Sequence, residues 1–125
     1  MKILLVDDSK TIRSIQKNAL KQLGFEDVAE AADGLEALAA IANARPDLMI
    51  VDWNMPNIDG ITLVRKVRET DRTMPMIMCT TEAEKPRIVA AIKAGVNDYI
   101  VKPFTPEVLN EKINRALGKA TTAAK

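Results

Sequence analysis

Short apolar runs alternate along the chain with longer stretches in which apolar residues recur at helical spacing. Each run is apolar throughout instead of alternating with polar residues, which is typical of strands buried on both faces of a sheet. The second run is the weakest of them. The pattern predicts five strands, at Ile3–Val6, Val28–Ala31, Leu48–Val51, Met76–Cys79 and Tyr99–Val101.

A stretch of helical period follows each predicted strand. Gly24, Gly95 and Gly118 stand where helices should end, and Pro86 suits the first turn of the fourth helix. Strict alternation of strand and helix predicts a doubly wound α/β fold, in which a parallel sheet carries helices on both faces. The positions expected to face the sheet are Ile12, Ile15, Ala19, Leu20 and Leu23; Leu35, Leu38 and Ala42; Ile61, Val64 and Val67; Ile88, Ala91 and Ile92; and Leu109, Ile113, Ala116 and Leu117.

Polar residues that could carry chemistry stand at the ends of four of the five strands. In open α/β sheets, ligands bind at the carboxyl ends of the strands. The second strand ends in alanines, so a strand order of 2-1-3-4-5 would leave it at the sheet edge and gather the other four ends around one pocket. The residues at those four ends are Asp7 and Asp8, then Asp52, then Thr80 and Thr81, and last Lys102.

Composition narrows the classes of function. The chain has 125 residues, and its 18 Lys and Arg against 17 Asp and Glu leave a net charge of +1. Its aromatic residues are two Phe, one Trp and one Tyr. Because the charge is balanced and aromatic residues are few, the chain lacks the basic stripe or stacking platform of a nucleic-acid binder. The absence of His excludes Ser-His triads and histidine metal sites, and a single cysteine, Cys79, excludes an internal disulfide.

No apolar run is long enough for a signal peptide or a membrane span, so we expect a cytoplasmic protein without a membrane contact. No repeat or second domain is visible. The predicted organisation is one domain over residues 1–118 and a flexible tail, rich in Ala and Thr, over residues 119–125.

Three carboxylates in one pocket imply a cation. At ~4 Å and an effective dielectric constant of ~20, each pair of carboxylates repels by about 4 kcal/mol. Oxygen ligands select a hard divalent ion, and so few carboxylates leave room for water and a phosphoryl oxygen, which favours Mg²⁺, with Mn²⁺ as a substitute. A carboxylate beside such an ion and a lysine can attack phosphorus. The pattern is that of a site for an aspartyl phosphate.

Four motifs in order carry a resemblance over essentially the whole chain. They are Leu5-Val6-Asp7-Asp8-Ser9; Val51-Asp52-Trp53-Asn54-Met55-Pro56 with Asp59-Gly60 after it; Thr80; and Tyr99-Ile100-Val101-Lys102-Pro103-Phe104. Together they resemble the receiver domain of bacterial two-component response regulators, whose fold is flavodoxin-like. Trp53, Asn54 and Glu82 resemble its stand-alone chemotaxis members most closely.

The resemblance implies a role for each residue of the predicted site. Asp52 would accept a phosphoryl group from the phosphohistidine of a partner histidine kinase. Asp8 and Asp52 would bind Mg²⁺ directly, Asp7 through water, and Asn54 through its backbone carbonyl. Lys102 would pair with Asp52 or its phosphoryl group, Thr80 would donate a hydrogen bond to that group, and Pro103 would be a cis proline that aims the lysine.

The resemblance also implies how the signal leaves the site. Thr80 would be drawn toward the phosphoryl group and Tyr99 would rotate inward, which changes an outer surface whose candidate contacts are Ile88, Tyr99, Val101 and Lys112. We expect a monomeric, single-domain response regulator that is not an enzyme, although it assists its own phosphorylation and dephosphorylation. Its expected partners are the kinase, a flagellar motor switch protein or another output protein, and a phosphatase.

Several alternatives remain open. Within the family, the chain could be a phosphorelay intermediate or a phosphate sink. A catalytic phosphatase would need a second acid where Asn54 stands, and a flavodoxin-like carrier would need a phosphate-binding loop where Asp7 and Asp8 stand. Individually, residues 7–9 could cap a helix, Asp59 could be a turn residue and Tyr99 a half-buried core aromatic. Thr81 departs from the small residue usual in the family, and it borders the path of an attacking water or donor.

Overall fold

The computed structural model describes residues 1–81, 84–102 and 104–118. The elements alternate strictly along the chain, as predicted. The strands are β1 (Ile3–Val6), β2 (Val28–Ala31), β3 (Leu48–Asp52), β4 (Met76–Thr80) and β5 (Asp98–Val101). The helices are α1 (Lys10–Gln22), α2 (Gly34–Asn43), α3 (Gly60–Thr70), α4 (Lys85–Ala94) and α5 (Pro106–Ala116).

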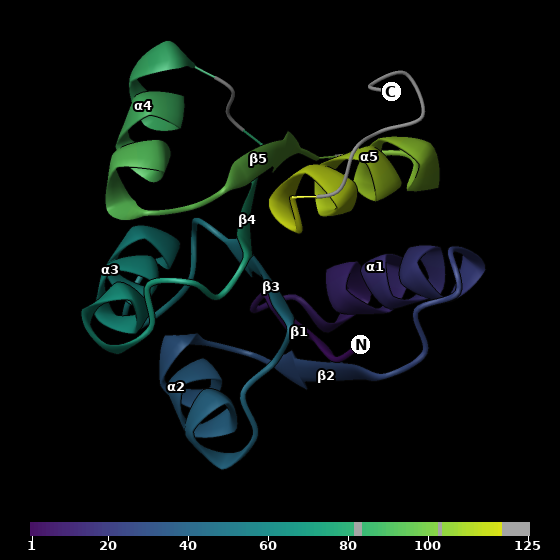
Figure 1. The fold of residues 1–125 in the computed structure, drawn as a ribbon, viewed down its shortest axis with the longest axis horizontal. Coiled ribbons are helices and arrows are strands. Elements are labelled where there is room, and N and C mark those ends of the chain that lie inside the picture. The colour runs from purple at the N-terminus through teal and green to yellow at the C-terminus, as the bar shows by residue number, and fades with distance from the viewer. Residues whose placement is uncertain (82–83, 103, 119–125) are drawn as a thin grey trace.

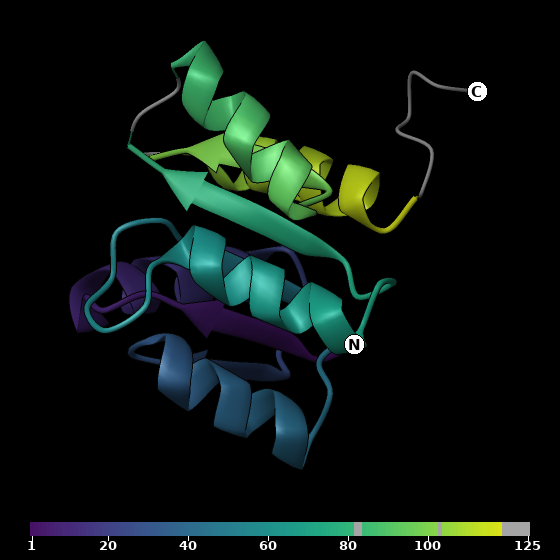
Figure 2. The same cartoon turned by 90° about the vertical axis from the view of Figure 1, so that its left-hand side faces the viewer.

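All five strands are parallel and lie in the order β2-β1-β3-β4-β5, which confirms the predicted doubly wound fold. Figure 1 shows the sheet nearly edge-on, with α2, α3 and α4 on one face and α1 and α5 on the other. Figure 2 looks onto the face that α2, α3 and α4 cover. In the register Val6 is opposite Val51 and Asp52 opposite Cys79, so neighbouring strands end side by side.

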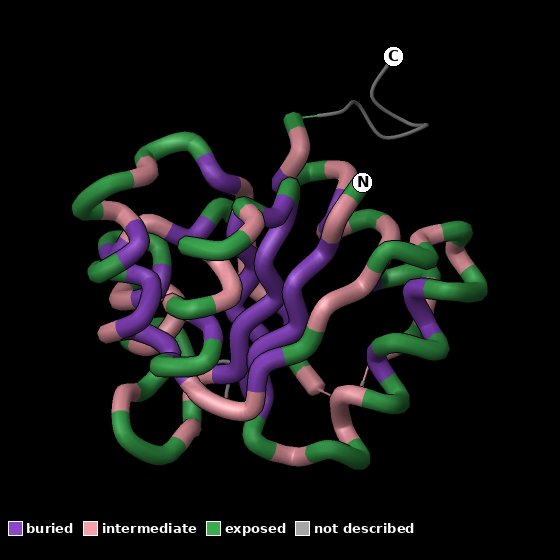
Figure 3. The backbone as a smooth tube through the Cα atoms, turned by 90° about the horizontal axis from the view of Figure 1, so that it is seen from below, coloured by how far each residue is buried: buried purple, intermediate pink, exposed green. Residues whose placement is uncertain are grey.

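The core consists of two apolar layers, one on each face of the sheet. The strands run as a buried band between exposed outer turns of the helices (Figure 3). One layer packs α2, α3 and α4 against side chains such as Met49 and Met78, and the other packs α1 and α5 against Ile50 and Ile77. Because both faces are covered, every residue of β1, β3 and β4 is buried, which explains their continuous apolarity.

Local signals place the helix ends as expected. The side chains of Ser9, Asp33, Asp59 and Thr105 each accept a hydrogen bond from a backbone amide of the first helical turn that follows them. Gly24, Gly95 and Gly118 follow helices with positive φ, the conformation that glycine adopts without steric cost.

Of the three positions of α2 predicted to face inward, Leu38 packs against the core as predicted, whereas the predictions for Leu35 and Ala42 were wrong. Leu35 is 58% exposed and Ala42 is exposed as well, while Ala37 is fully buried and Ile41 packs against the core. Gly34 is buried on this inward face and lies close beneath Ile58, so a Cβ there would require the side chain of Ile58 to shift. The face that points inward is therefore one position away from the predicted one.

Two isoleucines predicted to face the sheet also lie at the surface: Ile15 is 59% and Ile92 is 54% exposed. In α1 the buried position next to Ile15 belongs to Gln16, whose amide donates a hydrogen bond of 3.6 Å to Cys79 Sγ. A buried glutamine whose amide has a hydrogen-bond partner can occupy an inward position of a helix, as an aliphatic residue would. None of the described helices has the length and apolarity to cross a membrane. The predicted tail over residues 119–125 lies outside the described residues.

Candidate functional site

The carboxyl ends of β1 and β3 bring three carboxylates to one edge of the sheet. Asp7 and Asp8 follow β1 directly, and Asp52 is the last residue of β3. One carboxylate oxygen from each lies within 4.8 Å of the other two. Asp7 and Asp52 are 2% and 6% exposed, whereas Asp8 faces solvent. The structure thus brings together the three acids that the sequence placed at strand ends.

Lys102 is the cation of this cluster. It follows β5, and its backbone amide donates a hydrogen bond of 2.8 Å to the carbonyl of Thr80. Its Nζ lies 3.0 Å from Asp52 Oδ1 and 3.4 Å from Asp7 Oδ2. Burial disfavours the ammonium, but the hydrogen bond and attraction from Asp52 outweigh it and raise the pKa of Lys102. The lysine therefore stays charged against the carboxylates.

One ammonium does not balance three carboxylates. Burial raises the pKa of Asp52, and repulsion from Asp7 and Asp8 acts in the same direction, so that together they outweigh the opposing effect of Lys102. The donor set consists of carboxylate oxygens held within one small volume with an excess of negative charge. A hard divalent cation fits that set and would relieve the repulsion.

The loop after β1 is fixed by residues that do not belong to the cluster. Ser9 Oγ accepts from the amide of Ile12 and begins α1, while the amide of Ser9 donates to Asp7 Oδ1 at 2.9 Å. Capping is therefore the work of Ser9, which leaves the other Asp7 oxygen for the cluster. Arg13, which the sequence did not single out, ties the Asp7 carbonyl to Glu30 on β2.

The loop after β3 folds back against the backbone of Asp52 and Trp53. Gly60 donates a hydrogen bond of 2.8 Å to the carbonyl of Trp53, and a Cβ at Gly60 would lie 2.4 Å from the carbonyl oxygen of Asp52. Asp59 caps α3 through the amide of Thr62 at 2.9 Å, as a turn residue would. Asn54 lies exposed on the same loop. Gly60 therefore allows the loop to close against the end of β3.

Three of the predicted switch residues lie on the α4 side of the site, and Lys112 of α5 approaches one of them. Thr80 is 3% exposed at the end of β4, and Ile88 of α4 and half-buried Tyr99 of β5 line one narrow space with it. Lys112 Nζ lies 4.7 Å from the centroid of the Tyr99 ring, and Val101 is 36% exposed. The geometry makes these residues neighbours, while their coupling stays a prediction.

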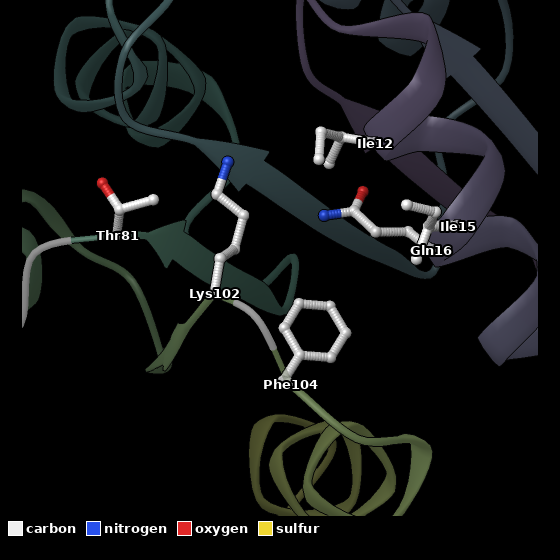
Figure 4. A pocket seen from close by; sticks show the side chains of 6 residues that line it. All are labelled: Ile12, Ile15, Gln16, Thr81, Lys102 and Phe104. Carbon is white, nitrogen blue, oxygen red and sulfur yellow. The ribbon is translucent and has the colours of Figure 1, made fainter.

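Two features near the cluster had no local signal in the sequence. The guanidinium of Arg87 lies 4.4 Å from the centroid of the Trp53 ring, which connects α4 to the residue after Asp52. Ile12, Ile15, Gln16, Thr81, Lys102 and Phe104 line a pocket beside the cluster (Figure 4). Both join side chains far apart in the sequence. Glu82 and Pro103, which the resemblance singled out, lie outside the described residues.

The lone cysteine takes no part in this chemistry. Cys79 is buried in the middle of the sheet, and burial raises the pKa of its thiol to about 12. The thiol therefore stays protonated, and Cys79 fills space in the core.

Comparison with known proteins gives a consistent result. The model of the response regulator receiver domain matches residues 3–114. Chemotaxis protein CheY1 of Helicobacter pylori is 54% identical over 121 residues, which are 94% of this chain and 98% of that protein. Chemotaxis protein CheY of Pseudomonas aeruginosa is 50% identical over 117 residues, or 92% of this chain and 94% of the relative.

Solved structures agree with this match. The chemotaxis response regulator CheY4 of Vibrio cholerae superposes with a TM-score of 0.86 at 40% identity, covering 93% of this chain and 98% of its own. A putative response regulator from Chloroflexus aurantiacus superposes with a TM-score of 0.88 at 37% identity, covering 94% and 98%.

Proposed function

The chain belongs to the response regulator receiver domain family, and from this premise we propose that it is a chemotaxis signalling protein that is switched by phosphorylation of Asp52. The observation that carries the proposal is the position of Asp52: a buried carboxylate at a strand end, beside two further acids and 3.0 Å from Lys102 Nζ. Such a carboxylate is disfavoured as it stands and is suited to react with an electrophile such as phosphorus.

The chain's own residues divide the work of phosphoryl transfer. A carboxylate oxygen of Asp52 attacks phosphorus, and the bond to the donor breaks with its electron pair going to the leaving group. Lys102 pairs with the phosphoryl oxygens that gain charge, and Thr80 donates a hydrogen bond to one of them. Asp7, Asp8, Asp52 and the backbone carbonyl of Asn54 would hold Mg²⁺, or Mn²⁺ in its place. When bound there, the ion supplies positive charge opposite the phosphoryl group.

A receiver domain works with a histidine kinase that supplies the phosphoryl group and with an output target. Because the relatives are chemotaxis proteins, the output target that we propose is a flagellar motor switch protein, with another output protein as the alternative. A phosphatase would reset the signal. The negative charge added at Asp52 would draw Thr80 inward and favour the inward rotamer of Tyr99. The target would then gain affinity only as far as it prefers that state, contacting Ile88, Tyr99, Val101 and Lys112.

Intact mass tests the acceptor. Treatment with acetyl phosphate and Mg²⁺ should add one phosphoryl group, and EDTA should prevent this. Asp52→Asn should remain unlabelled. The matched control is Asp59→Asn, which changes the acid that caps α3 on the loop after β3, and this variant should be labelled like the unaltered protein. Labelling of Asp52→Asn, or labelling without metal, would contradict the proposal.

Calorimetry tests the output. The protein activated with beryllofluoride should bind a peptide from a flagellar motor switch protein more tightly than the unmodified protein, and the gain should shrink in Thr80→Ala and Tyr99→Ala. Equal gains in all three proteins would contradict the coupling of Thr80 and Tyr99. No gain with any motor component would favour the alternative, a phosphorelay intermediate or phosphate sink.

A further inference from the structure

The pocket beside the carboxylate cluster is a second feature of the same edge of the sheet. Its volume is about 300 Å³, and it lies between α1 and the segment that joins β5 to α5. Figure 4 shows Ile12 and Gln16 of α1 directed toward Lys102, with Phe104 below. The pocket is continuous with the site, because Lys102 is part of its wall and also contacts Asp52.

The wall of the pocket is mainly apolar. Ile12, Ile15 and Phe104 supply hydrocarbon surface, and the amide nitrogen of Gln16 is engaged with Cys79. Ile15 is 59% exposed, although burial in the core would be the usual place for it. No acid lines the pocket among the described residues, so an anion can lie there without repulsion from its wall. An apolar cavity of about 150 Å³ holds a benzene molecule, so one flat ring fits this pocket.

We propose that this pocket binds the leaving group of the phosphodonor and favours an aromatic acyl phosphate, on the premise that Asp52 is the acceptor. The phosphoryl group would lie beside Lys102 and the ring would lie against Ile12, Ile15 and Phe104. In the step, an Asp52 oxygen bonds to phosphorus while the bond from phosphorus to the acyl oxygen breaks. The aromatic carboxylate leaves with that electron pair, and no proton is transferred.

The two donors to compare are benzoyl phosphate and acetyl phosphate. They carry the same reacting group and differ in the ring that the pocket would bury. Burial of the ring should raise the second-order rate constant roughly tenfold for benzoyl over acetyl phosphate. Intact mass against time gives both rate constants, and the ratio of the two is the measured quantity.

Variants separate the pocket from the reacting centre. Ile15→Ser and Phe104→Ala should lower the benzoyl-to-acetyl ratio to about twofold, because each removes part of the apolar wall. Ile92→Ser is the matched control: an equally exposed isoleucine, on α4, changed in the same way. It should leave the ratio unchanged. Since Ile15 is exposed, its replacement tests the pocket even where the change at Phe104 disturbs the fold.

The outcomes distinguish this inference from the function it rests on. A ratio near one in the unaltered protein, or the same ratio in Ile15→Ser and the unaltered protein, overturns the pocket and leaves Asp52 as the acceptor. An equal fall of both rate constants in Ile15→Ser also overturns it. No labelling of the unaltered protein by either donor contradicts the proposed acceptor, and the pocket proposal with it.

Discussion

The two ends of the central sheet are both rich in charged side chains, and they differ in how those charges are partnered. At the carboxyl end, Asp7 and Asp52 share the ammonium of Lys102, and the carboxylate of Asp8 lies in the same cluster. At the amino end, Asp71 has enough partners to satisfy both of its oxygens. Opposite directions of pKa shift follow: the pKa of Asp52 is raised by burial, and that of Asp71 is held well below its usual range by Arg45.

The amino end joins three loops through these partners. Asp71 accepts from the amides of Thr73 and Met74 at 3.1 and 3.0 Å and from Arg45 Nη2 at 3.2 Å. Arg68 donates to the carbonyls of Gly95 at 2.9 Å and Asp71 at 3.0 Å. The bond from Arg45 links the connection between α2 and β3 to that between α3 and β4, and the bond from Arg68 to Gly95 links α3 to the connection between α4 and β5.

The difference in how the two ends compensate their charges indicates that the carboxyl end is the less stable of the two. A site that must bind a cation and a phosphoryl group keeps charges poorly compensated until those ligands arrive, and such sites commonly cost stability. The amino end has no such task and can satisfy its groups completely. Substitutions at the two ends should therefore change stability in opposite directions wherever they remove a carboxylate.

Gly60→Ala should have the largest effect on stability. It tests whether the backbone at the carboxyl end is tightly packed, although the charges there are poorly compensated. The new Cβ would lie 2.4 Å from the Asp52 carbonyl oxygen, an atom that cannot move without shifting β3. We expect the free energy of unfolding, from urea denaturation followed by circular dichroism, to fall by about 2–3 kcal/mol.

Gly34→Ala is the control for that change, because its Cβ would meet only the flexible side chain of Ile58. It should cost less than Gly60→Ala. Equal losses of stability in the two variants would mean that the loop after Asp52 shifts easily. The carboxyl end would then be poorly packed in its backbone and poorly compensated in its charges.

Asp71→Ala should cost about 2 kcal/mol at neutral pH, mainly because the amides of Thr73 and Met74 lose their acceptor. The exposed partner Arg45 contributes little of this. Because the pKa of Asp71 is lowered in the folded state, its contribution is present above the ordinary value of 3.8 and is lost as the pH falls toward the folded pKa. Urea denaturation of both proteins from neutral to acidic pH measures this.

Glu69→Ala, at an exposed position of the same helix, is the control for Asp71→Ala and should change stability little. If the cost of Asp71→Ala stayed constant down to strongly acidic pH and beyond the folded pKa, the ionised carboxylate would not be the cause.

The sequence predicts the cluster of charged residues at the carboxyl end of the sheet better than the network at the amino end. The three acids and Lys102 could be placed together because each follows a continuous apolar run, and parallel strands end at a common edge. The network of Asp71, by contrast, uses turn residues that have no periodic signal. Its members, such as Arg45 and Arg68, look like ordinary surface charges until the loops are placed.

Helix rotation is a second limit. The apolar residues of α2 fill most of the helix circumference, so their spacing does not separate the inward residues Ala37 and Ile41 from the exposed Leu35. Ile15 was predicted to face the sheet because it shares a helical face with Ala19 and Leu23, yet it lines the pocket beside Lys102. Spacing alone does not distinguish a residue that fills a core from one that lines a surface pocket.

Asp52→Asn should move stability in the direction opposite to Asp71→Ala, with a gain of about 1 kcal/mol at neutral pH. The change removes one of three repelling carboxylates and leaves Lys102 with Asp7 at 3.4 Å. Because the pKa of Asp52 is raised in the folded state, the folded protein holds that proton more tightly than the unfolded chain, and its stability falls as the pH rises through the folded pKa. The gain should therefore be present at neutral pH and absent below the ordinary value of 3.8.

Asp59→Asn is the control for Asp52→Asn, since asparagine caps a helix about as well as aspartate and stability should hardly change. A loss of stability in Asp52→Asn at neutral pH would show that the ion pair with Lys102 outweighs the repulsion, and the proposed contrast between the two ends would fail.

The smallest effect concerns Arg87, a charged residue at the carboxyl end whose guanidinium contacts an aromatic ring. Arg87 lies 4.4 Å from the Trp53 ring centroid, and such a contact contributes about 0.5–1 kcal/mol at a partly exposed site. A double-mutant cycle with Arg87→Ala and Trp53→Leu, followed by circular dichroism in urea, should give a coupling energy of that size. The same cycle with Arg65→Ala, an exposed arginine of α3, should give none. Because Trp53 adjoins Asp52 and Arg87 belongs to α4, a coupling indistinguishable from that of Arg65 would mean that the two are neighbours without attraction. The contact between α4 and the residue after Asp52 would then contribute packing alone.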